Sequence, residues 1–202
     1  ATRFDLRGVG YDSADGTLAA AGIAAEGELR VSGTNAQPRL ALDARLHGGE
    51  ALAGAFYAKL PSTPVGVRAD ASWDGHAVAL RQFDWSDGDT LAFAARGAIE
   101  PAAAQPLREL QVDLREARLE AALGRYAQSW LASKGYAHLE GRGRLSGALH
   151  FDAEGLQRFA FDARDVGLRD GDGRFSFEGV DGGVGWDYRG ATPATTLAWL
   201  DS

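Results

Sequence analysis

The sequence predicts an all-β fold, mainly an antiparallel meander, with one short amphipathic helix near residues 119–133. Three observations predict it. A seven-residue pattern of alternating apolar and small or polar residues, bounded by glycines, occurs at residues 16–22, 27–33 and 173–179. Turn pairs such as Asp74-Gly75 recur between alternating segments, as in successive β-hairpins. The period of the apolar residues changes once from that of a strand to that of a helix.

The N-terminal half alternates between apolar and charged residues, which predicts strands with one apolar face and one charged face. Charged or polar residues fall between the apolar positions, among them Asp43, Arg68 and Asp70. The apolar positions include Leu40, Leu42, Ala44, Leu46, Leu52, Phe56, Ala58, Leu60, Val65, Val67, Ala69, Ala71, Trp73, Leu91, Phe93, Ala95 and Ile99. Because strands joined by tight turns pair antiparallel, we expect sequence neighbours to be sheet neighbours.

The helix is predicted where the apolar spacing changes, at Leu119, Leu123, Tyr126, Trp130 and Leu131. Gly135 follows this segment, and glycine readily adopts the left-handed conformation that ends many helices. Alternation resumes after it, and the last strand is predicted at residues 195–200.

A small-residue segment between Pro101 and Pro106 (PAAAQP) is the one candidate domain boundary. It fits either a linker between domains or a loop within one sheet, and the alternation that resumes on both sides favours the loop. We therefore expect residues 1–202 to form a single extended β unit. The chain starts in a strand-like segment and stops in another, so we expect it to be an internal fragment of a larger protein.

Composition excludes several classes of function. The net charge is −7 and the 21 basic residues are dispersed, so a nucleic-acid partner is not expected. The absence of cysteine excludes disulfides and thiolate metal sites. No apolar run approaches the 18 or so residues of a membrane-spanning helix.

No motif in the chain points to catalysis, a cofactor or a metal. The four histidines are dispersed, and neither a Gly-x-Ser-x-Gly motif nor a nucleotide-binding glycine turn is present. Asp170, Asp172 and Gly173 begin like a calcium loop, but Arg174 follows where an oxygen ligand is needed, so we interpret them as a turn. The glycines and aspartate of residues 182–187 are likewise interpreted as a turn before a strand. We expect no enzyme activity.

Large aromatic residues fall on successive strands after the helix, and two explanations are open. They pack against the helix, or they form part of an uncovered face, because one short helix is too small to cover a sheet of ten or more strands. An open apolar trough would accept acyl chains. The candidate groove residues are Leu145, Leu149, Phe151, Phe159, Phe161, Phe175, Phe177 and Trp186.

The segment 110–165 has a specific order of elements: a strand (LQVDLREARL), a short helix (EAALGRYAQSWLAS) and a return phrase that contains Leu145, Gly147 and Leu149. In this order it resembles the AsmA-like envelope proteins of bacteria, the group that includes TamB and YdbH. The phrase from Asp172 to Gly179, followed by Gly182 and Trp186, is similar to the YdbH-type variant. The resemblance covers about half of the chain.

This resemblance implies a periplasmic protein that is anchored in the inner membrane through a segment absent from this chain. Such proteins extend as a curved antiparallel sheet with a lipid-lined groove and are implicated in moving phospholipid between the two membranes. It therefore implies two partners: phospholipid or another acyl-chain ligand, and neighbouring β segments of the same parent chain. The family has no catalytic residue to carry over.

The residues alone leave other functions open. A structural or adhesive domain, built as a closed β-sandwich or barrel and bound to another envelope protein, is the main alternative. A carbohydrate-active enzyme is the third, and it would need two carboxylates that face each other across a polar cleft. The open fold and the closed fold differ in whether the inward residues are buried by protein or remain exposed along one channel.

Overall fold

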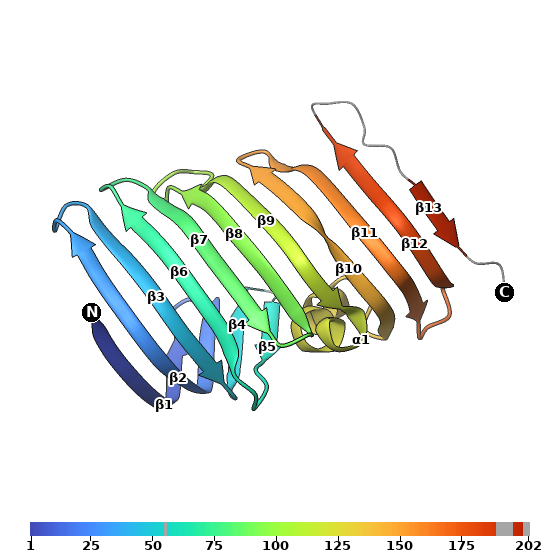
Figure 1. Ribbon diagram of the computed structural model, residues 1–202, viewed down its shortest axis with the longest axis horizontal. Helices are drawn as coiled ribbons and strands as arrows, with labels where there is room; N and C mark the ends of the chain where they lie inside the picture. Colours follow the sequence, from blue (N-terminus) through green and yellow to red (C-terminus); the bar gives the residue numbers. More distant parts are fainter. Residues whose placement is uncertain (55, 189–195, 200–202) are drawn as a thin grey trace.

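The computed structural model describes residues 1–54, 56–188 and 196–199, which form thirteen strands of one sheet and one helical segment (Figure 1). The strands are β1 (Thr2–Asp12), β2 (Leu18–Gly33), β3 (Pro38–His47), β4 (Glu50–Ala53), β5 (Phe56–Lys59), β6 (Val65–Trp73), β7 (Val78–Asp87), β8 (Leu91–Ile99), β9 (Leu107–Arg118), β10 (Leu139–Asp152), β11 (Gly155–Asp170), β12 (Ser176–Asp187) and β13 (Thr196–Trp199). The last strand was predicted at 195–200, of which residues 195 and 200 lie outside the described residues.

Over most of the sheet, the order of the strands is their order in the sequence. Hydrogen-bonded neighbours run in the order β13-β12-β11-β10-β9-β8-β7-β6-β3-β2-β4-β5, and β1 pairs with β2. From β6 to β13 each strand pairs antiparallel with the next, which confirms the predicted meander. β1 and β13 lie at opposite ends of the sheet (Figure 1), so the sheet is open and extended. The closed β-sandwich that the sequence left as an alternative is wrong.

The helical segment consists of α1 (Leu119–Ala122), a π-helical turn η1 (Leu123–Ala127) and α2 (Gln128–Ser133), which confirms the prediction of a helix over 119–133. It ends as expected at Gly135. This glycine has φ +84°, and its N–H donates to the carbonyl of Ala132 at 3.0 Å. A positive φ is nearly free for glycine and strained for other residues, so Gly135 lets the chain turn back toward β10.

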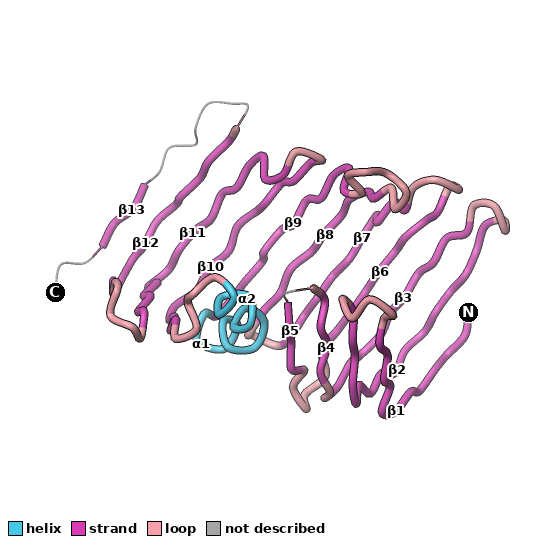
Figure 2. The backbone as a smooth tube through the Cα atoms, turned by 180° about the vertical axis from the view of Figure 1, so that it is seen from behind, coloured by secondary structure: helices cyan, strands magenta, loops and turns pink. Residues whose placement is uncertain are grey.

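β4 and β5 form a short hairpin that leaves the simple meander. β2 pairs with β3 through residues 24–33 and with β4 through residues 18–21. Gly48 and Gly49 separate β3 from β4, both with positive φ. The hairpin lies beside the helix at one end of the long strands (Figure 2). The Tyr57 N–H of β5 donates to Ser129 Oγ at 3.0 Å, so the edge of this hairpin is tied to the helix.

The glycine-bounded pattern lies in longer strands than the sequence suggested. Residues 16–22 and 27–33 were expected to be separate short strands between tight turns, but both fall largely within the single strand β2. Gly22 has φ +66°, and the pairing of β1 with β2 shifts register beside it, between Val9 and Tyr11. The glycine therefore marks an irregularity within a strand that is paired on both sides, where no turn can form.

The segment between Pro101 and Pro106 connects two strands that are paired neighbours. Ile99 of β8 is the register partner of Leu107 of β9, and the Glu100 N–H donates to the carbonyl of Pro106 at 2.7 Å. The segment is therefore a loop between adjacent strands of one continuous sheet.

One cluster of the buried core lies where the helix meets the sheet. Leu119, Ala163 and Val166 are its buried members, and the partly buried residues packed against them are Leu123, Leu145, Leu168 and Val180. Gly141 of β10 lies directly under the helix, because a Cβ at this position would be 2.5 Å from the Leu123 Cδ1. Fully burying one leucine side chain contributes about 2 kcal/mol, so this small cluster is a main source of helix docking.

Candidate functional site

The sheet carries an unbroken apolar line on the face that also holds the helix. Register pairing joins one residue of β3 and one of each strand from β6 to β12 into a cross-strand row, named here the apolar row: Leu42, Ala69, Phe83, Ala95, Val112, Leu149, Phe159 and Trp186. Register partners in antiparallel strands point to the same face. The apolar row therefore crosses the sheet without a charged residue.

The apolar row is not covered by the helix or by the β4–β5 hairpin. Each of its members is half-buried or exposed, and Trp186 at its end is 37% exposed. Farther from the helix the same face shows Leu40 at 45% and Ile99 at 42% exposed. We call this region, from the apolar row to the strand ends remote from the helix, the open apolar face. Figure 2 shows the helix and the hairpin at the other end of the strands.

Aromatic side chains enlarge the apolar surface around the C-terminal end of the apolar row. Phe159 lies 5.7 Å from Phe161 and 6.2 Å from Trp186 between ring centroids, both pairs nearly parallel. Gly147 makes room for this arrangement, because a Cβ there would be 2.5 Å from Cδ1 of Phe161. The rings lie next to one another and form a continuous apolar surface.

The candidate groove residues fall into three groups. Leu149, Phe159 and Trp186 belong to the apolar row, Phe161 stacks beside them, and Phe151 continues β10 toward the remote end, as register partner of Leu110 and Leu156. Leu145 instead packs into the core beneath the helix.

Phe175 and Phe177 lie at the other end of the strands, near the chain that leaves the helix. Their rings are 6.1 Å apart, and Phe175 is 6.3 Å from Tyr136. These two candidates therefore lie at the covered end of the sheet, apart from the apolar row.

Sequence reasoning left the N-terminal half out of the candidate groove, although Phe83 of the apolar row belongs to it. Phe83 and Phe93 lie 5.8 Å apart, and Trp85 stacks on Phe93 at 6.4 Å. The signal that could have found them is the same alternation, but a register shift between Leu80 and Phe83 interrupts it in β7.

A polar clamp holds the helix on the apolar side. The Tyr126 hydroxyl donates to Asp87 Oδ2 at 2.7 Å, and Arg125 forms an ion pair with the same carboxylate, which is 3% exposed. Burial, and then the hydrogen bond to Asp87, raise the pKa of Tyr126. Trp85 meets the edge of the Tyr126 ring at 5.9 Å. The clamp therefore ties the helix to the end of β7.

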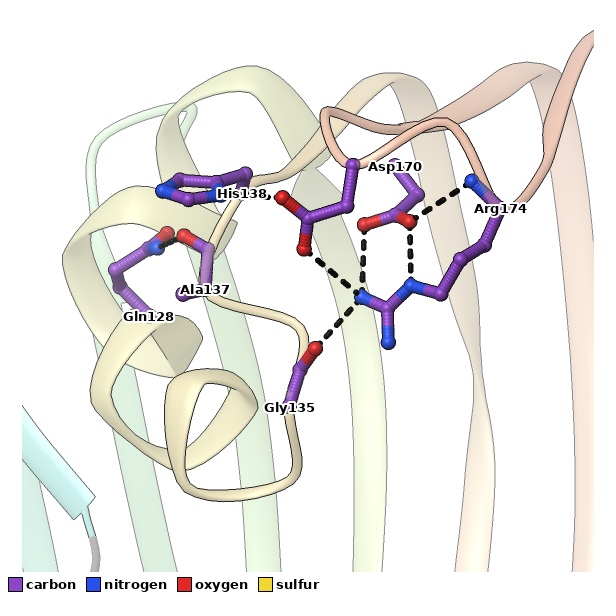
Figure 3. Close-up of polar contacts among 7 residues, drawn as sticks. Gln128, Gly135, Ala137, His138, Asp170 and Arg174 are labelled. Atoms are coloured by element: carbon purple, nitrogen blue, oxygen red, sulfur yellow. Dashed lines mark hydrogen bonds and ion pairs between the residues drawn. The ribbon is translucent and has the colours of Figure 1, made fainter.

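A second polar cluster closes the turn between β11 and β12 (Figure 3). Arg174 Nε donates to Asp170 Oδ2 at 2.5 Å, and its Nη2 donates to the Gly135 carbonyl at 2.6 Å. The Arg174 guanidinium also stacks over Tyr136 at 4.5 Å. Its hydrogen bonds lower the pKa of Asp170, which is 2% exposed, to about 2. The residues that resemble a calcium loop thus form a turn neutralised by arginine.

The opposite face is charged and carries cross-strand ion pairs. Arg68 pairs with Asp43 at 3.1 Å, and Arg169 with Glu140 at 2.5 Å. The acids near Trp85 are separated: Asp84 accepts from Arg115 on the charged face, whereas Asp87 binds the helix. Within the described residues no group of three or more His, Cys, Asp or Glu side chains is placed to hold a metal ion.

Comparison with known proteins adds no relative: no family model, no curated protein and no solved structure matches the chain. In the part of the chain that the structure describes, no helix is long and apolar enough to cross a membrane.

Proposed function

We propose that the open apolar face binds the acyl chains of phospholipid, and that the chain is a section of a periplasmic bridge-like lipid-transfer protein between the inner and outer membranes. The observation that carries this proposal is the apolar row, which crosses the sheet from β3 to β12 and has no described element above it. A soluble protein rarely leaves so continuous an apolar surface exposed unless it binds something.

The dimensions of the row suit an acyl chain. Neighbouring strands lie about 4.8 Å apart, so a row that crosses from β3 to β12 is roughly 34 Å long. Half of the hydrocarbon core of a bilayer is about 15 Å thick, which is the depth that one acyl chain occupies. A bound chain would therefore cross several strands, and each Å² of apolar surface removed from water would contribute about 25 cal/mol.

The two faces of the sheet have different surface properties, and such a protein requires both. The charged face, with its cross-strand ion pairs, keeps the outside of the sheet hydrated, while the opposite face offers the apolar row. The outer edge of β1 has no partner strand within the described residues, and such an edge can pair with a further β segment of the same parent chain. The envelope location and the membrane anchor enter this proposal through the resemblance to AsmA-like proteins.

Native mass spectrometry of the chain after expression in a bacterial envelope tests the proposal. We expect co-purified phospholipid, and a double variant with Leu149→Gln and Phe159→Gln in the apolar row should lose most of it. Ser146→Gln on the charged face of β10 is the matched control and should retain lipid. Recovery of the unsubstituted protein without lipid would contradict acyl-chain binding at this face. An equal loss of lipid in the Ser146→Gln control would contradict it as well.

A further inference from the structure

The charged face of the sheet contains a hollow that the acyl-chain proposal does not use. It has a volume of about 680 Å³ and lies over β7 to β11, on the side opposite the apolar row. Ala94, Ala148 and Ala160 are register neighbours of Asp84 and Asp113 along one row, so small side chains form its floor. The volume is within the range of small-molecule sites, roughly 300–1,000 Å³.

Two β-bulges each add an arginine to this hollow. In β7, Arg81 and Gln82 together oppose the single Arg96 of β8, because Leu80 pairs with Gly97 and Phe83 with Ala95. Arg81 and Gln82 both line the hollow as a result. A regular strand would send these two consecutive side chains to opposite faces.

The second bulge lies in β9. Ala92 pairs with Glu116 and Phe93 with Leu114, so Arg115 is the extra residue between them. Arg115 lines the hollow and donates to Asp84 at 2.5 Å. Bulges often re-aim side chains next to functional sites, and two of them here direct cations to one place.

The charge of the hollow is opposite in sign to that of the whole chain. Four arginines and two aspartates line it, along with His150, whereas the chain carries a net charge of −7. A second hollow on the same face, of about 530 Å³, is lined by three arginines and four acids. There Arg30 pairs with Glu28 and Arg45 with Glu26.

Two of the arginines in the first hollow have no carboxylate bound to them in the described part of the chain. Arg96 Nε donates to the amide oxygen of Gln111 at 2.8 Å, and Arg81 forms no hydrogen bond or ion pair with a side chain there. The charge of Arg81 acts on Asp70 through space. It lowers the pKa of that carboxyl, but less than the hydrogen bond between Asp70 and Arg39 does. Asp113 is exposed and is an unoccupied acceptor in the same described region.

We propose that this hollow binds a small phosphorylated molecule that also carries a hydroxyl group. A phosphate monoester has a charge of about −1.5 to −2 at pH 7, which matches the two arginines that have no carboxylate partner. Guanidinium groups bind phosphate oxygens in a forked geometry, so Arg81 and Arg96 take the phosphate. Asp113 accepts a hydrogen bond from the hydroxyl group. The site is independent of the acyl-chain proposal, because it lies on the other face of the sheet.

Titration of the protein with glycerol 3-phosphate and with inorganic phosphate, followed by backbone amide NMR, tests the assignment. We expect shifts around Ala94, Ala148 and Ala160, with tighter binding of glycerol 3-phosphate. Arg81→Gln and Arg96→Gln should each weaken binding about tenfold, because a charge-assisted hydrogen bond is lost. Arg45→Gln, which removes the same charge from the second hollow, should change affinity less than about twofold.

Two further arms separate the possible explanations. Ala148→Leu keeps every charge but fills the floor of the hollow, so it should abolish binding; unchanged affinity in this variant would overturn the site. If Arg45→Gln weakened ligand binding as much as Arg81→Gln and Arg96→Gln do, the effect would be general charge attraction and the proposed site would be overturned. Flotation with vesicles that contain phosphatidylglycerol tests a lipid headgroup as the source of phosphate, and binding to vesicles without binding of glycerol 3-phosphate would overturn a soluble ligand.

Discussion

The two ends of the same apolar face differ in how they are covered. At one end, the helix packs on the sheet, and Leu119, Ala163 and Val166 are buried at that contact. Toward the other end, the face carries residues of the same type, yet Leu40 is 45% exposed. Both regions arise from the same alternation along the strands. Packing at the covered end stabilises the fold, and the open end leaves apolar surface available for a ligand.

This difference predicts where the stability of the molecule resides. Substitutions beneath the helix should destabilise the fold strongly, whereas matched substitutions on the open apolar face should change ligand binding more than stability. The predictions below test that division, beginning with the largest expected effect.

Leu119→Ala should lower the free energy of unfolding by about 3 kcal/mol, because a buried leucine is lost and a cavity remains. Leu40→Ala is the matched control on the open apolar face and should cost less than about 1 kcal/mol. Urea denaturation followed by circular dichroism measures both. Similar losses in the two variants would mean that the open face is covered in solution.

Gly141→Ala should lower the free energy of unfolding by about 1 kcal/mol, because the added Cβ would lie 2.5 Å from the Leu123 Cδ1 and 3.2 Å from the Leu119 Cβ, so the Leu123 side chain must move and the helix must shift slightly from β10. Gly124→Ala is the control, because a Cβ added at this position on the helix would meet no atom within 4 Å beyond the adjoining helix backbone. Thermal unfolding and amide hydrogen exchange in the helix measure the effect. Unchanged exchange in Gly141→Ala would contradict direct seating of the helix on this glycine.

Tyr126→Phe should lower the free energy of unfolding by about 1 kcal/mol, because it removes one hydrogen bond from the buried Asp87 carboxylate and leaves the ring in place. Faster amide exchange is expected in the helix and not in β12. An equal rise in exchange at both places would show that the clamp is not specific to the helix.

The Asp170–Arg174 pair should make stability depend on pH in the acid range. The pKa of Asp170 is lowered to about 2 in the folded chain, so the unfolded chain binds this proton first as the pH falls. The contribution is therefore present above about pH 4 and is lost progressively toward about pH 2. In urea titrations, Arg174→Gln should reduce the loss of stability over this interval. An unchanged pH profile in the variant would contradict the pairing.

Much of the fold could be predicted from local patterns. The helix was found because Leu119, Leu123 and Tyr126 follow a period that strands do not have, and it ends before a glycine as expected. The meander was found because glycine-containing turns join short alternating segments. These signals are local, since they depend on side-chain spacing and backbone conformation within a few residues.

The sequence could not divide the candidate groove residues between the covered end and the open end of the sheet. Leu145 and Leu149 belong to the same alternating pattern and to the same face of β10. The first nevertheless packs beneath the helix, and the second lies in the apolar row. Which of two similar residues is covered depends on where the helix folds back, and that is a long-range contact. The bulge at Arg81 was also missed, because its register shift is defined by the strands on either side.

The sequence by itself determined the all-β class, the position of the helix and the separation of an apolar face from a charged face. Each follows from the period of the side chains and from the turn residues. Only the tertiary structure decided that the sheet remains open, that the helix covers one end of it, and that bulges gather arginines over an alanine floor. Those features depend on register and packing between distant strands, which spacing along the chain does not specify.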